Sequence, residues 1–158
     1  MSLGIQKFSH VVMQVSDLGR SVDFYCGLLG LEKLFERSYS DPRTGRTQQV
    51  VGCLVGGTVV LELGADPERP RAIDGRSAPI LALSVADIRE AHRRLLEAGV
   101  TPTMPPTEMA PGLFMIFLRD PDGRTIELAQ FSGGATCSVE YARAGNGVGS
   151  APDAKSSG

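Results

Sequence analysis

Three side chains that could bind a metal or move a proton stand inside segments that otherwise look like buried strands. His10 lies in FSHVVMQV, Glu62 in GTVVLELG and Glu127 in RTIELAQ. Burying an unpaired carboxylate is costly, so a glutamate flanked by leucines faces water or has a cationic partner. Taken alone, each residue has a structural explanation: a histidine satisfied in the core, and two glutamates on the solvent side of amphipathic strands.

Taken together, the three side chains suggest a site. One imidazole and two carboxylates suit a divalent ion such as Mg, Mn, Fe, Ni or Zn. Open coordination positions would accept substrate oxygens, and either Glu62 or Glu127 could leave the metal to accept a proton. The other possibility is a cleft without metal, in which His10 and a glutamate act as hydrogen-bonding or acid–base groups.

The elements around these residues occur twice along the chain. A strand is followed by a helix with an aspartate cap, Asp17 or Asp87, and a glycine stop, Gly30 or Gly99. Extended runs separated by turn signals come next in each half. The predicted strands are 8–15, 31–40, 46–56 and 57–64, then 78–86, 100–108, 112–120 and 124–130.

The repeat predicts an α+β fold with two βαβββ modules that form a curled mixed sheet around a cleft. Module one is expected at about 6–64, a linker at 65–77 and module two at 78–131, within a domain of 1–131. His10, Glu62 and Glu127 fall on first or last strands of the modules, so all three can point into that cleft. Residues 132–158, rich in Gly, Ala and Ser, are expected to form a flexible tail, in which Val139, Glu140 and Tyr141 could dock as a short element.

Composition narrows the possible partners. The chain has 158 residues, of which 42% are hydrophobic and 22% charged, and its formal net charge is −2. No block of like charge favours nucleic acid, and no apolar run is long enough to span a membrane. Cys26, Cys53 and Cys137 are odd in number and lack CxxC spacing, which argues against a disulfide framework or a thiolate zinc site and favours a cytoplasmic location.

Two stretches resemble a known family. FSHVVMQVSDLGRSVDFYCGLLGLEKL is similar to the opening of a vicinal oxygen chelate domain, and LRDPDGRTIELAQ to its closing hairpin. This superfamily includes glyoxalase I, methylmalonyl-CoA epimerase, extradiol dioxygenases, fosfomycin-resistance proteins and bleomycin-binding proteins. The resemblance covers roughly residues 6–131. It implies a small-molecule substrate and a homodimer, built either side by side or by exchange of modules.

The resemblance also implies a ligand set, and the chain departs from it at one position. In glyoxalase-like members the metal ligands come from the first and last strands of each half, which here are His10, Glu62, Ile80 and Glu127. Isoleucine cannot bind a metal, and His92 is expected on the solvent side of the second helix. The departure lowers the expectation of an extradiol dioxygenase and of a complete glyoxalase I site.

Two functions stay open at this point. The first is a glyoxalase-like metal-dependent enzyme of isomerase, epimerase, lyase or dioxygenase type, which chelates two neighbouring oxygens and uses Glu127 and Glu62 in catalysis. The alternative is a non-catalytic protein, like bleomycin-resistance proteins, that sequesters a small molecule in the groove between modules. Arg37, Tyr39 and Arg46 could meet an anionic substrate, although surface charge is the ordinary explanation for them.

Overall fold

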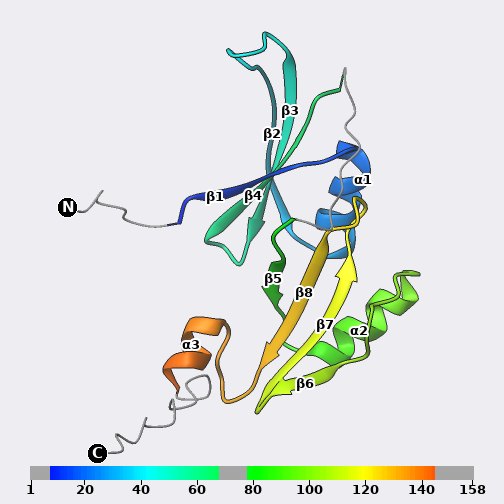
Figure 1. The fold of residues 1–158 in the computed structure, drawn as a ribbon, viewed down its shortest axis with the longest axis vertical. Helices are drawn as coiled ribbons and strands as arrows, with labels where there is room; N and C mark the ends of the chain where they lie inside the picture. The colour runs from blue at the N-terminus through cyan, green and yellow to red at the C-terminus, as the bar shows by residue number, and fades with distance from the viewer. Residues whose placement is uncertain (1–7, 68–77, 145–158) are drawn as a thin grey trace, which may run out of the picture. The chain divides into compact units, whose positions relative to one another are not determined.

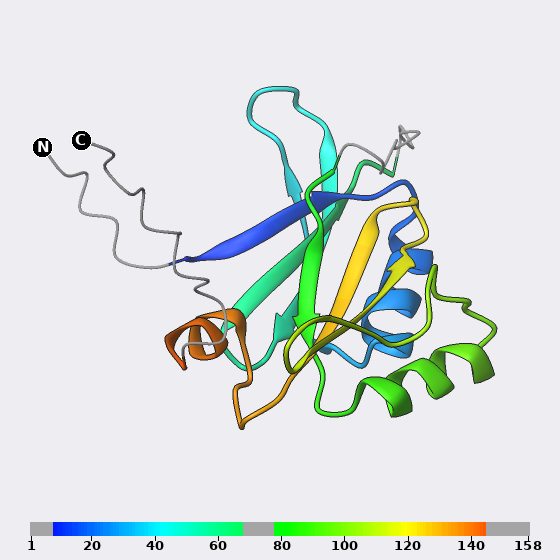
Figure 2. The same cartoon turned by 60° about the horizontal axis from the view of Figure 1, so that its bottom comes forward.

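The protein folds into two compact units, each built on one mixed four-stranded sheet (Figure 1 and Figure 2). The computed structural model describes residues 8–67 and 78–144. One unit comprises Met1–Pro79 with Arg119–Thr125, and the other Ile80–Leu118 with Ile126–Gly158. The predicted α+β class and the two βαβββ modules are confirmed.

The first unit places its first and last strands side by side. Its sheet has the order β1-β4-β3-β2, in which β1 and β4 are parallel and the other pairs antiparallel. The elements are β1 (His10–Gln14), α1 (Leu18–Val22), the π-helical turn η1 (Asp23–Leu28), β2 (Glu32–Ser40), β3 (Thr47–Val55) and β4 (Val59–Ala65).

One face of this sheet forms the core of the first unit. Leu61 and Leu63 of β4 are almost completely buried, as is Cys53 of β3. The helix α1 packs against β3 and β4, and Tyr25 of η1 is fully buried. Asp17 begins the helix as predicted, because its carboxylate accepts a hydrogen bond from the backbone N–H of Arg20 at 2.9 Å.

The second unit repeats this pattern. Its sheet has the order β5-β8-β7-β6, again with the first and last strands parallel. The elements are β5 (Leu81–Ser84), α2 (Ile88–Glu97), β6 (Thr107–Ala110), β7 (Leu113–Arg119), β8 (Thr125–Phe131) and α3 (Ser138–Arg143). Its buried residues come from the helix and from alternate strand positions: Ile88, Leu95, Ile116, Leu118, Ile126 and Leu128.

The sixth strand is much shorter than predicted. The sequence suggested 100–108, whereas β6 covers only Thr107–Ala110. Pro102, Pro105 and Pro106 explain the difference, because proline has no backbone N–H to donate to a neighbouring strand.

The segment expected to be a tail contains a docked helix, as the interruption at 139–141 allowed. In α3, Tyr141 is buried, and its hydroxyl donates to the carbonyl of Pro111 at 2.6 Å. Its ring lies 5.4 Å from that of Phe131. Residues 145–158, like residues 68–77 of the expected linker, lie outside the described part of the chain. In the part that is described, no helix is long and apolar enough to cross a membrane.

Candidate metal centre and the open face of the first sheet

The two faces of the first sheet differ in exposure. Side chains alternate along each strand, so Glu62 points away from the core that contains Leu61 and Leu63. We call the face that bears Glu62 the open face. The strand registers assign to it His10, Val12, Gln14, Phe35, Arg37, Tyr39, Gln48, Val50, Gly52 and Glu62, of which Val50 is buried.

His10 and Glu62 lie on this same face. Val12 is the neighbour of Glu62 in the β1–β4 register, and His10 stands two residues before Val12. The His10 side chain is exposed, and its Nδ1 lies 2.9 Å from Oγ of Ser9. The interpretation of His10 as a core histidine is therefore wrong, because β1 turns that side chain away from the core.

Glu62 has a cationic partner. Nη2 of Arg37 donates to Oε1 of Glu62 at 3.2 Å, and the Glu62 side chain is only 16% exposed. The Arg37 guanidinium also lies 4.6 Å from the centre of the Phe35 ring. The sequence offered Arg37 only as a candidate contact for an anionic substrate. Its pairing with Glu62 depends on the β2–β3–β4 register, which the sequence does not reveal.

The second sheet reproduces the position of Glu62. Ala82 of β5 is the neighbour of Glu127 of β8, just as Val12 is the neighbour of Glu62. Ile80 stands two residues before Ala82 and therefore corresponds to His10. Its side chain is exposed, at 55%.

Glu127 differs from Glu62 in its electrostatic surroundings. Burial raises the pKa of the Glu127 carboxyl above its ordinary value, because a partly desolvated carboxylate is disfavoured. A raised pKa makes this carboxylate a stronger base than one in open water. At neutral pH its charge is tolerated more readily beside a cation.

The three side chains predicted to bind a metal are divided between the two units. Among the described residues, no three His, Cys, Asp or Glu side chains form a metal-binding group. The first unit provides His10 and Glu62 on one face, and the second provides Glu127. Their nitrogen and oxygen donors are those that Mn, Fe, Ni or Zn accept. The half-buried Glu62 carboxylate already has a cation beside it.

The remaining candidates are His92, Tyr39 and Arg46. His92 is on α2 and only partly exposed, not on a strand. Tyr39 is the neighbour of Gln48 in the β2–β3 register, so it shares the open face, where its side chain is 48% exposed. Arg46 forms an ion pair with Asp66, at 3.6 Å, so it is not a free cation for a ligand.

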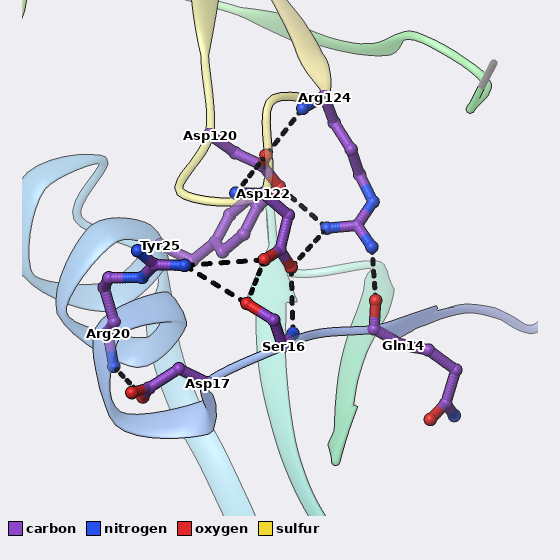
Figure 3. Close-up of polar contacts among 8 residues, drawn as sticks. All are labelled: Gln14, Ser16, Asp17, Arg20, Tyr25, Asp120, Asp122 and Arg124. Carbon is purple, nitrogen blue, oxygen red and sulfur yellow. Dashed lines mark hydrogen bonds and ion pairs between the residues drawn. The ribbon is translucent and has the colours of Figure 1, made fainter. Parts of the chain in front are cut away.

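A second polar cluster was not expected from the sequence (Figure 3). The β7–β8 turn, predicted from Asp-Pro-Asp-Gly, brings Asp120, Asp122 and Arg124 into the first unit. Arg124 is buried, and its Nη1 lies 3.0 Å from the Asp120 carboxylate and 2.9 Å from that of Asp122. Its Nη2 donates to the carbonyl of Gln14, at the end of β1.

Tyr25 of η1 and Ser16 of the β1–α1 connection complete this cluster. The hydroxyl of Tyr25 donates to Asp120 at 2.8 Å, and Ser16 donates to Asp122 through both its backbone N–H and its hydroxyl. Burial raises the pKa of Tyr25 well above its usual range, and the Asp120 carboxylate adds to this effect. Burial would also raise the pKa of Asp122, but hydrogen bonds from Ser16 and Arg124 outweigh it, so that pKa is lowered.

The cluster fixes the end of β1 and the start of the first helix. A buried cation with two carboxylates and several hydrogen bonds satisfies every charge that it brings inside. The sequence signal for it was three charged residues within five positions of a turn between two apolar strands. Their partners near Ser16 are about a hundred residues away, so no local pattern could identify them.

Comparison with known proteins finds relatives along most of the chain. The chain is 32% identical over 125 residues to the "Probable lactoylglutathione lyase" of Synechocystis, covering 78% of this chain and 94% of that protein. It is 32% identical over 126 residues to the lactoylglutathione lyase of Neisseria meningitidis, covering 79% and 91%.

Solved structures match as well. Leishmania major glyoxalase I, described as trypanothione-dependent, superposes with a TM-score of 0.64 and 26% identity over 80% of this chain and 87% of that one. A superfamily member from Sphaerobacter thermophilus gives 0.62 and 32% identity over 81% and 99%. A family model matches residues 7–128. The chain therefore belongs to the Glyoxalase/Bleomycin resistance protein/Dioxygenase superfamily.

Proposed function

We propose that the protein is a metal-dependent enzyme of lyase or isomerase type that acts on a small substrate with two neighbouring oxygens. The observation that carries the proposal is the repeated register: Glu62 beside Val12 in one sheet, and Glu127 beside Ala82 in the other. His10 adds an imidazole to the first of these positions. Relatives named lactoylglutathione lyase support a lyase over an oxygen-inserting enzyme.

Each residue has a role in this proposal. His10, Glu62 and Glu127 would hold a divalent cation. The cation would act as a Lewis acid that lowers the free energy of negative charge developing on the substrate oxygens. Glu127 is the better proton acceptor, because burial raises its pKa. Its carboxylate would take a proton from a hydroxyl-bearing carbon next to a carbonyl and return it to the carbonyl carbon. The hydroxyl proton would move to the former carbonyl oxygen, so the net reaction is an isomerisation.

The assembly follows from the division of the ligands. His10 and Glu62 belong to one unit and Glu127 to the other, so a full donor set requires both units, from one chain or from two. We expect a homodimer, since twofold dimers are the commonest closed assemblies. The three cysteines, Cys26, Cys53 and Cys137, are free thiols, in keeping with a cytoplasmic enzyme.

Metal binding tests the proposal directly. The full chain is stripped with a chelator, and Mn²⁺ binding is then measured by equilibrium dialysis. His10→Ala, Glu62→Gln and Glu127→Gln should each weaken binding by about tenfold or more, since even indirect partners of a metal site contribute that much. Lactoylglutathione, the compound in the relatives' names, is the first substrate to test.

Glu36→Gln provides the matched control. Glu36 lies on β2 beside Val51, whose side chain belongs to the buried face, so the same change is made away from the open face. This variant should bind Mn²⁺ like the natural protein. If the natural chain binds no divalent metal and a chelator leaves its melting temperature unchanged, the metal-dependent enzyme is the wrong function.

One observation favours a second function. The exposed Ile80 occupies the position equivalent to His10, which removes one ligand of a complete site. A groove lined with an apolar residue there would suit a binding protein that holds a small molecule without reaction. Tight binding of an apolar ligand to metal-free protein, with no turnover in the presence of Mn²⁺, would establish this function instead.

A further inference from the structure

Arg37 forms an ion pair with Glu62, the carboxylate that the proposed function assigns to the metal. Its Nη2 lies 3.2 Å from Oε1 of Glu62, while 57% of the Arg37 side chain stays exposed on the open face. The Glu62 side chain, 16% exposed, has less contact with water than its partner. The pair therefore consists of a mostly buried carboxylate and a cation that can reach solvent.

The neighbouring residues hold the guanidinium in place. In the strand registers, Phe35, Gly52 and Glu62 form one row across β2, β3 and β4. The Phe35 ring lies directly over Gly52, where an added Cβ would come within 2.4 Å of the ring. The Arg37 guanidinium in turn lies 4.6 Å from the centre of that ring. A glycine in β3 thus makes room for the aromatic support of Arg37.

We propose that Arg37 is a specificity-determining residue that exchanges partners. It neutralises Glu62 while no metal is bound, and it binds an anionic group of the substrate, such as a carboxylate, once a metal has taken Glu62. The inference rests on the proposed function and adds the substrate class to it.

Charge drives this exchange. A divalent ion beside Glu62 meets the positive charge of Arg37, and two cations that share one carboxylate repel each other. An anion that pairs with Arg37 removes the repulsion, and the Phe35 ring keeps the guanidinium on the same face. Metal and anion should therefore each strengthen binding of the other, because the coupling between two sites is reciprocal.

The test compares two arginines that both form an ion pair with a carboxylate. Mn²⁺ affinity of the chelator-stripped full chain is measured for Arg37→Gln and for Arg43→Gln. Arg43 pairs with Asp41 in the β2–β3 turn, at 3.2 Å, and its side chain is 87% exposed. Arg37→Gln should bind Mn²⁺ at least about fivefold more tightly than the natural chain, since both the competitor and a repelling charge are gone. Arg43→Gln should change it less than about twofold, and Arg37→Lys, which keeps the charge, should stay near the natural value.

Acetate serves as the anionic probe. Replacing chloride by acetate at constant ionic strength should raise the Mn²⁺ affinity of the natural chain and of Arg43→Gln, but not of Arg37→Gln. Equal affinities for the two glutamine variants, or an acetate effect that persists in Arg37→Gln, would overturn the inference and leave the metal site intact. If no variant binds Mn²⁺, the proposed function itself fails, and the inference fails with it.

Discussion

The two sheets share a backbone pattern and differ in the side chains placed on it. In both, the first strand runs parallel to the last, and a glutamate of the last strand stands beside a small or β-branched residue of the first. In the first sheet, His10 precedes that residue and Arg37 pairs with the glutamate. In the second, Ile80 takes the place of His10, and burial raises the pKa of Glu127.

The comparison indicates that the shared fold constrains buried strand positions more strongly than exposed ones. Strand pairing and core packing depend on buried residues such as Leu63 and Leu128, which both sheets keep. An exposed position such as 10 or 80 contributes little to the core, so its residue type can change without loss of the fold. The two hairpin turns also differ: Gly56-Gly57 joins β3 to β4, whereas a charged turn joins β7 to β8.

The largest effect should come from that charged turn. Arg124→Met leaves the buried carboxylates of Asp120 and Asp122 without their cation, which should cost about 3–5 kcal/mol of unfolding free energy. For a chain of this size, the melting temperature should fall by about 6–20 °C. Differential scanning calorimetry measures the shift.

Arg119→Met is the control on the same hairpin. Arg119 is exposed and its Nη1 donates to Gly123 and Thr125, so removing it should cost less than about 1 kcal/mol. Equal melting temperatures for the two variants would mean that the cluster contributes no more than an ordinary surface contact.

A smaller effect should come from making the two sheets alike. Ile80→His places an imidazole at the position equivalent to His10. If position 80 faces the same site as His10, Glu62 and Glu127, Mn²⁺ should bind about tenfold more tightly. This corresponds to about 1.4 kcal/mol of binding free energy. Leu96→His, at an exposed position on α2, controls for a histidine placed elsewhere. Equal Mn²⁺ affinities for the natural chain and Ile80→His would show that position 80 does not face the metal centre.

The smallest effect should distinguish the two glutamates in metal-free protein. The raised pKa of Glu127 favours folding below the ordinary pKa of a carboxyl, and this contribution is lost as the pH rises through the folded value. Glu127→Gln should therefore stabilise the protein at pH 7 by less than about 1 kcal/mol, and the gain should vanish near pH 4.

For Glu62→Gln, we expect no gain in stability at pH 7. It breaks the pair with Arg37, so it should leave the stability at pH 7 unchanged or lower it by up to about 1 kcal/mol. Thermal unfolding at pH 4 and pH 7 provides both comparisons. Destabilisation by Glu127→Gln at pH 7 would show that its carboxylate has a favourable partner rather than a burial cost.

Local patterns predicted most strands to within two or three residues, both helix caps and the helix-ending glycines. These features depend on alternation, on short side chains that accept backbone N–H groups, and on the freedom of glycine at positive φ, as at Gly30 and Gly99. The sequence failed at β6, where three prolines interrupt the pairing. The sequence did not decide whether α3 forms, because six residues are too few to predict a helix without knowing that Tyr141 is buried.

The sequence by itself determined which residues have the chemistry for a site, and that they repeat at corresponding strands. His10, Glu62 and Glu127 stand out because each is a polar residue within an apolar run, which the sequence shows directly. Only the tertiary structure decided that Arg37 meets Glu62 and that Arg124 meets Gln14 and two aspartates. Long-range partners depend on strand register and on the path of the chain, and a one-residue shift in register would turn every side chain to the other face.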